Sequence, residues 1–228
     1  MQIHRPIPSQ QIKLLIFDLD GTLIDSRQDL VNSVNAALRS LHRSELPSDE
    51  IAAMVGDGAP ALVRRALGDT VDEDLLRRGL EFFLSYYREH KLDHTHLYAG
   101  IPEALETLQG ANGARRVMSV LTNKPVNPSR AIIDALGIGP RFVSVYGGNS
   151  FETKKPDPLG INTILVETGV RPEEAVMIGD SAVDILTGRA AGTWTCGVTY
   201  GFAPHTLVET PGDIVLDAPQ ELAGLLSL

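Results

Sequence analysis

Cysteine is nearly absent from this chain of 228 residues, and the single one, Cys196, cannot form an internal disulfide. Such scarcity is typical of proteins from a reducing compartment, so we expect a cytoplasmic protein. No apolar run approaches the 18 or so residues of a membrane-spanning helix, so no membrane partner is expected. Residues 1–6 also lack a hydrophobic signal region, and we predict that residues 1–12 form an untethered N-terminal tail.

Positive charge is scarce as well. The chain has 20 Lys and Arg residues against 29 Asp and Glu residues, which gives a formal net charge of −9. The basic residues are scattered and form no stripe, which argues against a nucleic-acid backbone as a partner. A small anionic substrate is still compatible with this charge, because one metal ion and one or two lysines can reverse the local sign.

The apolar residues that are present form short, unbroken runs, which are typical of strands buried on both faces of a parallel sheet. The predicted strands are 14–17, 117–121 and 175–178, with weaker candidates at 142–146, 195–198 and 214–216. Helical patterns lie between them, at 102–108, 129–136, 158–168 and 181–191. This alternation predicts an α/β fold, a Rossmann-like doubly wound parallel sheet.

The segment 26–92 has a different character, because apolar residues recur there at helical spacing and no strand pattern interrupts them. Ser26 can cap the first of its helices, and two more are expected at 60–67 and 72–89. We therefore predict a helical cap domain at 26–92, inserted into a core that consists of residues 13–25 and 93–228.

The most distinctive motif places two carboxylates, Asp18 and Asp20, directly after the apolar run 14–17. Phosphate monoesters resist hydrolysis strongly, and one enzymatic route divides the reaction through a covalent aspartyl-phosphate. A second carboxyl group must then protonate the leaving alcohol and later activate water. The spacing of the two aspartates suits one acting as the nucleophile and the other as the general acid and base. A calcium-binding EF-hand loop is excluded, because its sixth position would be Leu23 where glycine is required.

A second acidic motif, Asp180 and Asp184, follows the apolar run 175–178. Asp184 lies one helical turn beyond Asp180 and can face the same pocket. A phosphate dianion beside three or four carboxylates would meet on the order of 10 kcal/mol of repulsion. We therefore expect Mg²⁺ to be held by Asp18 and Asp180, with Asp184 and Ser181 in support, and we expect a chelator to abolish activity.

Three further residues complete the predicted phosphate site. Thr122 and Asn123 end the run 117–121 and can donate hydrogen bonds to phosphoryl oxygens. Lys155 is held in an extended loop by the proline that follows it, and its compact charge suits a phosphoryl oxygen. Lys154 is the alternative lysine. Lys124 either adds charge to the site or is solvated in its loop.

With these clusters in place, the chain resembles the haloacid dehalogenase superfamily of phosphohydrolases, and most of all the phosphoglycolate phosphatases. Residues 18–26 are similar to the first motif of that superfamily, 122–125 to the second, 155–158 to the third and 179–184 to the fourth. The resemblance implies a helical cap inserted after the first motif. It also implies hydrolysis of a small phosphorylated metabolite, most of all 2-phosphoglycolate, to glycolate and phosphate.

The resemblance also implies a role for each site residue. Asp18 would be the nucleophile and Asp20 the general acid and base. Mg²⁺ would be held by Asp18, Asp180 and the backbone carbonyl of Asp20, with Asp184 supporting. The implied phosphoryl binders are Thr122, Asn123 and Lys155. The cap loop 55–58, with Arg64 and Arg65 after it, is similar to a substrate-facing segment, which implies that Gly56, Asp57, Gly58 and Arg64 contact the substrate.

Other readings of the same residues are weaker. A sugar-phosphate phosphomutase or a pyrophosphatase could use the same scaffold, and a panel of substrates would separate them from a phosphatase. A non-enzymatic phospho-receiver module also combines acidic residues with Thr or Ser and Lys on an α/β sheet. Receivers are short single domains, however, and their phosphorylated aspartate lies on a later strand than the acidic pair. The long helical insert of this chain therefore disfavours that reading.

Overall fold

The computed structural model describes residues 1–68, 70–110 and 116–225, so positions 111–115 and 226–228 of the predicted core lie outside it. Its main sheet has seven strands in the order β1-β9-β8-β7-β2-β5-β6. The strands are β1 (Gln2–Ile3), β2 (Leu14–Phe17), β5 (Val117–Leu121), β6 (Ser144–Tyr146), β7 (Ala175–Gly179), β8 (Trp194–Val198) and β9 (Ile214–Leu216). All neighbouring strands are parallel except β1 and β9, which confirms the predicted α/β fold.

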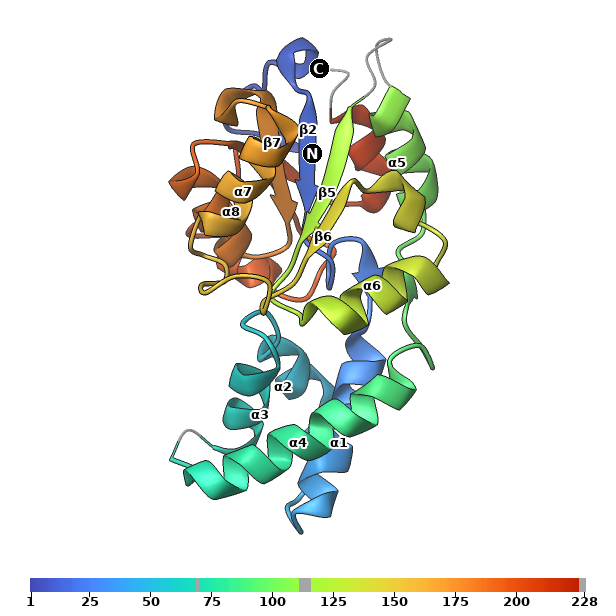
Figure 1. Cartoon of the computed structure of the whole chain (residues 1–228), viewed down its shortest axis with the longest axis vertical. Helices are drawn as coiled ribbons and strands as arrows, with labels where there is room; N and C mark the ends of the chain where they lie inside the picture. The colour runs from blue at the N-terminus through green and yellow to red at the C-terminus, as the bar shows by residue number, and fades with distance from the viewer. Residues whose placement is uncertain (69, 111–115, 226–228) are drawn as a thin grey trace.

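Helices cover both faces of this sheet (Figure 1). They are α5 (Ile101–Gly110), α6 (Val126–Ala135), α7 (Leu159–Thr168) and α8 (Ala182–Ala190). Side chains alternate along β2, so Leu15 and Phe17 join the apolar cluster that includes α5 and α6, whereas Leu14 and Ile16 join the cluster that includes α7. Burial on both faces explains why the sequence of β2 is an unbroken apolar run.

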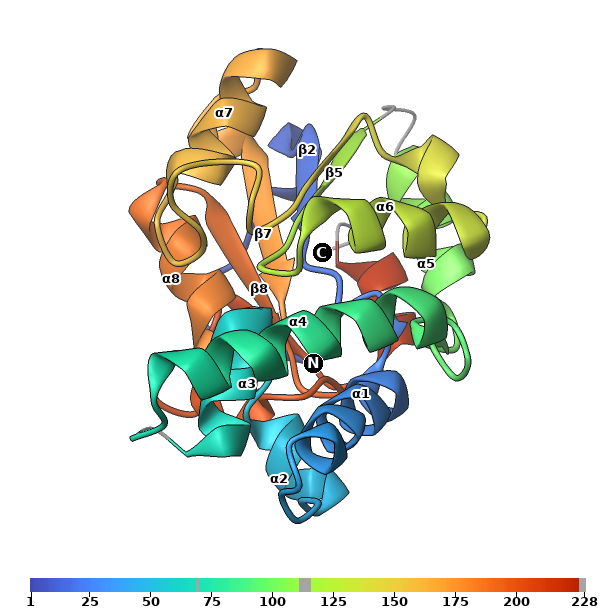
Figure 2. The ribbon, with the colours of Figure 1, turned by 60° about the horizontal axis from the view of Figure 1, so that its bottom comes forward.

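Four helices form a separate layer below the sheet, at the carboxyl ends of its strands (Figures 1 and 2). They are α1 (Arg27–Ser40), α2 (Ser48–Ala53), α3 (Ala59–Leu67) and α4 (Glu73–His90). The Asp72 side chain caps α4 by accepting a hydrogen bond from the Leu75 N–H at 2.9 Å. We call these four helices the cap. None of the helices in the described ranges combines the length and apolarity needed to cross a bilayer.

The cap joins the core through two chain segments that pair as a small ribbon, β3 (Ile24–Asp25) with β4 (His96–Leu97). Asp29, on the first turn of α1, is buried and ties the segments together. Its carboxylate accepts hydrogen bonds from the N–H groups of His94 and Thr95 and from the Thr95 hydroxyl, at 2.7–3.1 Å. The two connections are therefore fixed to each other at the point where the cap begins.

The N-terminal residues do not form the untethered tail that we predicted. Gln2 and Ile3 pair with β9, and the Met1 ammonium forms ion pairs with Asp217 and Glu221, both at 3.1 Å. Ile7 is buried as well. An edge strand of two residues is too short to show a period in the sequence, so tertiary pairing decides its structure.

One predicted helix also begins earlier than expected. Helix α6 starts at Val126 and not at residue 129, with Pro128 in its first turn. A proline is tolerated there because the first N–H groups of a helix have no partner within the helix. Among the described residues, the remaining short helices are of the 3₁₀ type, at Ser9–Gln11, Gly139–Arg141, Pro172–Glu174, Pro204–Leu207 and Pro219–Gly224.

Candidate active site

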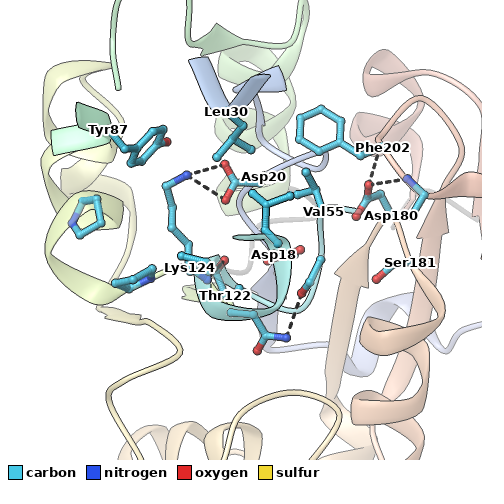
Figure 3. Close-up of a pocket in the computed structure, with 18 of the residues that line it drawn as sticks. Asp18, Asp20, Leu30, Val55, Tyr87, Thr122, Lys124, Asp180, Ser181 and Phe202 are labelled. Atoms are coloured by element: carbon cyan, nitrogen blue, oxygen red, sulfur yellow. Dashed lines mark hydrogen bonds and ion pairs between the residues drawn. The ribbon is translucent and has the colours of Figure 1, made fainter. Parts of the chain in front are cut away.

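The three reactive clusters of the sequence meet at the carboxyl ends of the central strands. Asp18 follows β2, Thr122 follows β5 and Asp180 follows β7, and β2 lies between the other two strands. From β2 the chain continues first to one side of the sheet and later to the other, and the crevice at such a reversal is where ligands bind in open α/β sheets. All three residues line one pocket (Figure 3).

The acidic cluster consists of the carboxylates of Asp18, Asp180 and Asp184, each of which offers an oxygen within 4.8 Å of the others. All three side chains are buried. Burial raises the pKa of Asp18 to about 6, with Asp184 adding to the effect and Lys155 opposing it. Burial and the neighbouring Asp184 and Asp18 raise the pKa of Asp180 to about 8. Both shifts arise because ionised carboxylates are close together away from water.

Lys155 is the lysine that enters this cluster. Its ammonium lies 2.8 Å from Asp18 and 2.6 Å from Asp184, and its side chain is only 2% exposed. Burial disfavours its charge, but Asp18 and Asp184 outweigh that effect and raise its pKa. Lys154, the alternative, is on the exterior and donates to the backbone carbonyl of Asp57.

The cluster suits a divalent cation. Once all three carboxyl groups are ionised, as binding of a metal requires, they and the one ammonium leave a local charge of −2, which Mg²⁺ would neutralise. Carboxylate oxygens are also the ligands that Mg²⁺ prefers. The donor set and its charge therefore fit the metal that the sequence predicts.

Backbone geometry orients Asp180 toward this site. Its carboxylate accepts hydrogen bonds from the N–H groups of Phe202 at 2.6 Å and Ala203 at 3.2 Å (Figure 3). Gly21, with φ of +81°, passes so near that a Cβ at this position would collide with the Asp180 carboxylate. The glycine after Asp20 is thus required by both its conformation and this close approach.

Asp184 is held at the start of α8 by Ser181. The Ser181 hydroxyl and N–H both donate to one oxygen of the Asp184 carboxylate, at 2.7 and 3.2 Å. The other oxygen accepts from Lys155. This capping arrangement pairs N–H groups at the start of the helix and fixes the Asp184 carboxylate within the acidic cluster.

Asp20 belongs to a second ion pair in the pocket. The Lys124 ammonium lies 2.9 and 3.1 Å from its two carboxylate oxygens (Figure 3). The Ser26 hydroxyl also donates to this carboxylate. Lys124 is 7% exposed, so it is part of the site and is not solvated in its loop. The sequence left its role open, although its position directly after Thr122 and Asn123 was the available signal.

Thr122 and Asn123 are placed differently from each other. Thr122 is buried and lines the pocket. The Asn123 amide instead donates to the backbone carbonyls of Gly56 at 3.0 Å and Lys155 at 3.1 Å. Its side-chain N–H groups are therefore engaged in joining the cap loop to the core and are not free for a phosphoryl oxygen in this conformation.

The opposite wall of the pocket comes from the cap, and the pocket encloses about 710 Å³, including space open to solvent. This wall, which we call the cap wall, is mainly apolar and consists of Leu30, Val55, Gly56, Gly58, Ala59, Leu62, Phe83, Leu84 and Tyr87.

Of the four cap residues predicted to contact substrate, Gly56 and Gly58 line the pocket. The other two point elsewhere. The Asp57 side chain pairs with Arg65, and Arg64 pairs with Glu73 at 2.8 Å. Oppositely charged neighbours within the cap thus hold both side chains away from the pocket.

Comparisons with known proteins match nearly the whole chain. A model of the haloacid dehalogenase-like hydrolase family matches residues 15–198. A Vibrio parahaemolyticus protein named phosphoglycolate phosphatase is 35% identical over 226 residues, covering 96% of this chain and 98% of that protein. A Chromobacterium violaceum protein of the same name is 35% identical over 221 residues, covering 95% and 97%. A crystal structure of a predicted phosphoglycolate phosphatase from Haemophilus somnus has a TM-score of 0.88 at 30% identity, covering 94% and 98%. These matches span both the core and the cap.

Proposed function

Since the chain belongs to the haloacid dehalogenase-like hydrolase family and is a phosphatase, we propose that it hydrolyses 2-phosphoglycolate to glycolate and phosphate with the aid of Mg²⁺. The observation that carries this proposal is the buried group of Asp18, Asp180 and Asp184 around Lys155, beside the separate pair of Asp20 and Lys124. Two carboxyl groups in separate surroundings can take separate roles, one as nucleophile and the other as proton donor and acceptor.

In this proposal, Mg²⁺ would be held by the carboxylates of Asp18 and Asp180 and by the backbone carbonyl of Asp20, with Asp184 and Ser181 in support. When bound, the ion would offset the repulsion between the carboxylates and the substrate and would polarise a phosphoryl oxygen. Lys155 supplies a further positive charge to the phosphoryl group, and Thr122 supplies a hydroxyl donor.

The chemical steps are assigned to the two aspartates of the first motif. A carboxylate oxygen of Asp18 attacks phosphorus, and the bond from phosphorus to the leaving oxygen breaks as Asp20 donates a proton to that oxygen. This leaves an aspartyl-phosphate on Asp18 and releases glycolate. Asp20 then accepts a proton from water as the water oxygen attacks phosphorus, which frees Asp18 and releases phosphate.

Two properties of the protein are part of the same proposal. A cytoplasmic location is consistent with the low cysteine content, and no nucleic-acid partner is expected from the net charge of −9. The partner is a small phosphorylated metabolite that fits beneath the cap.

The test is phosphate release from a panel of small phosphomonoesters, a sugar phosphate and pyrophosphate, with Mg²⁺ and with EDTA. We expect 2-phosphoglycolate to be the best substrate and EDTA to abolish the reaction reversibly. Asp18→Asn should be inactive, whereas the matched variant Asp57→Asn, outside the pocket, should retain activity. Full turnover in EDTA, or an active Asp18→Asn protein, would contradict the proposal.

A further inference from the structure

Two polar side chains, one from the core and one from the cap, meet beside the Asp20 carboxylate. The Lys124 ammonium, from the core, lies 4.6 Å from the centre of the Tyr87 ring, from helix α4 of the cap (Figure 3). Both residues line the pocket, and both are buried. A cation and a phenol are thus placed together where the cap meets the core.

The Tyr87 hydroxyl is the more unusual of the two groups. It is buried beside the Lys124 ammonium, which can only donate to its oxygen, and within the part of the chain that the structure describes its O–H has no acceptor. Burial raises its pKa to about 12, so this hydroxyl is a neutral donor at physiological pH. Buried hydroxyl groups normally have a partner, and leaving one unpaired costs roughly 1–3 kcal/mol. A bound ligand with an acceptor oxygen would supply that partner.

Lys124 is the only positively charged side chain among the described residues that line the pocket. The two arginines of the cap are engaged elsewhere, Arg64 with Glu73 and Arg65 with Asp57 and the Met54 carbonyl. Lys155 is occupied by Asp18 and Asp184 at the phosphoryl end. Lys124 is also paired, with Asp20, but unlike the other three it lines the pocket, so an acidic group on the substrate other than the phosphate can reach this cation.

The surroundings of Lys124 would strengthen such a contact. The adjoining pocket walls are apolar, with Leu30, Phe83 and Leu84 from the cap and Pro125 and Pro128 from the core. Charges that meet where water is excluded attract each other more strongly than charges at the surface. Lys124 also donates to both oxygens of Asp20, so a substrate anion bound to Lys124 would lie next to the proposed general acid.

We propose that Lys124 and Tyr87 form the subsite that binds the acidic substituent of the leaving group, through an ion pair to Lys124 and a hydrogen bond from the Tyr87 hydroxyl. The inference rests on the proposed function, because glycolate is a leaving group with a carboxylate. A wholly apolar leaving group would fit the apolar walls of the pocket but would leave the Tyr87 O–H without a hydrogen-bond acceptor.

The test compares two ligands that the enzyme cannot hydrolyse, 3-phosphonopropionate and 3-hydroxypropylphosphonate, in the presence of Mg²⁺. They share the phosphonate and chain length, but only the first has a carboxylate. Calorimetry on the full chain should show that the wild-type protein binds the carboxylate ligand at least about 10-fold more tightly, as expected for a charge-assisted contact.

Three variants test which side chains cause the preference for the carboxylate ligand. Lys124→Met should abolish it, and Lys124→Arg should restore part of it. Tyr87→Phe should reduce it by about 3-fold to 10-fold while leaving the Lys124–Asp20 pair in place. Tyr86→Phe is the matched control, since it removes a hydroxyl from the same helix outside the pocket, and it should leave the preference unchanged.

The outcomes distinguish a failure of the subsite proposal from a failure of the proposed function. If the wild-type protein shows no preference for the carboxylate ligand, or if Lys124→Met and Tyr87→Phe both keep the preference, the subsite is overturned. Because neither ligand is hydrolysed, this result does not depend on whether 2-phosphoglycolate is a substrate. Turnover of 2-phosphoglycolate without any carboxylate preference in binding would support the phosphatase and still overturn the subsite.

Discussion

The core and the cap wall hold their side chains in place by different forces. In the core, charged groups hold one another, as Lys155 does with Asp18 and Asp184. The cap wall is mostly apolar and meets the core through backbone carbonyls, such as that of Gly56, which accepts from Asn123. Substitutions in the core should therefore change the chemistry, whereas substitutions in the cap should change which leaving group is accepted.

The largest expected effect comes from Asp18 itself. Asp18→Asn keeps the size of the side chain but removes the proposed nucleophile, and we expect kcat to fall by about 10⁴-fold or more, as for nucleophiles in other hydrolases. Phosphate release measures this fall, and a retained melting temperature would show that the fold is intact. A loss of less than about 10-fold would remove Asp18 from the role.

Lys155→Met should have the next largest effect. It leaves three buried carboxylates without their cation, so we expect kcat to fall by about 10²-fold or more and the free energy of unfolding to drop by about 3–5 kcal/mol without Mg²⁺. Urea denaturation and phosphate release measure the two effects. Lys154→Met is the matched control on the neighbouring, exposed residue, and it should change kcat by less than about 3-fold. Equal effects of the two variants would break the distinction between the buried and the exposed lysine.

The extent to which Mg²⁺ stabilises the core, unlike any effect in the cap, should depend on pH. The pKa values of Asp18, at about 6, and Asp180, at about 8, both lie above the ordinary aspartate value of 3.8. The folded protein without metal therefore binds more protons than the unfolded chain, and its stability should fall as pH rises from about 4 to about 8. Mg²⁺ needs the ionised carboxylates, so its stabilising effect should grow over the same range.

Thermal unfolding with saturating Mg²⁺ and with EDTA measures this effect. We expect Mg²⁺ to raise the melting temperature by about 5–10 °C near pH 8 and by much less near pH 5. In the Asp180→Asn protein, Mg²⁺ should raise the melting temperature much less than in the wild-type protein. An increase that is independent of pH would mean that the ion binds away from this cluster.

The smallest effect is expected in the cap, at Arg64. Its ion pair with Glu73 is exposed and directed away from the pocket, so Arg64→Ala should change kcat/KM for 2-phosphoglycolate by less than about 2-fold. The stability change should be within about 1 kcal/mol. A large increase in KM would show that Arg64 turns into the pocket when substrate binds.

The core could be predicted from the sequence because its signals are local. The strand Leu14–Phe17 is a continuous apolar run, and Val117–Leu121 is apolar except for Ser119; the predicted ends of both match the structure. Parallel strands end at one edge of a sheet, so the polar residues after each run had to converge. Lys155 could be singled out because the proline after it ruled out a helix at that position.

Other features depend on contacts between distant segments and could not be predicted in this way. The short strand Gln2–Ile3 has no pattern of its own and exists because β9 offers an edge. The burial of Lys124 follows from its pairing with Asp20, 104 residues earlier in the chain. Arg64 looked like a substrate contact next to the cap loop, but a neighbouring helix supplies Glu73 as its partner.

A crystal structure with Mg²⁺ and fluoroberyllate, which mimics a phosphoryl group on a carboxylate, tests the central claim most directly. We predict that the fluoroberyllate is attached to an oxygen of Asp18 and that Mg²⁺ contacts both Asp18 and Asp180. Fluoroberyllate on Asp20, or Mg²⁺ bound at a site that does not include Asp18 and Asp180, would contradict the account.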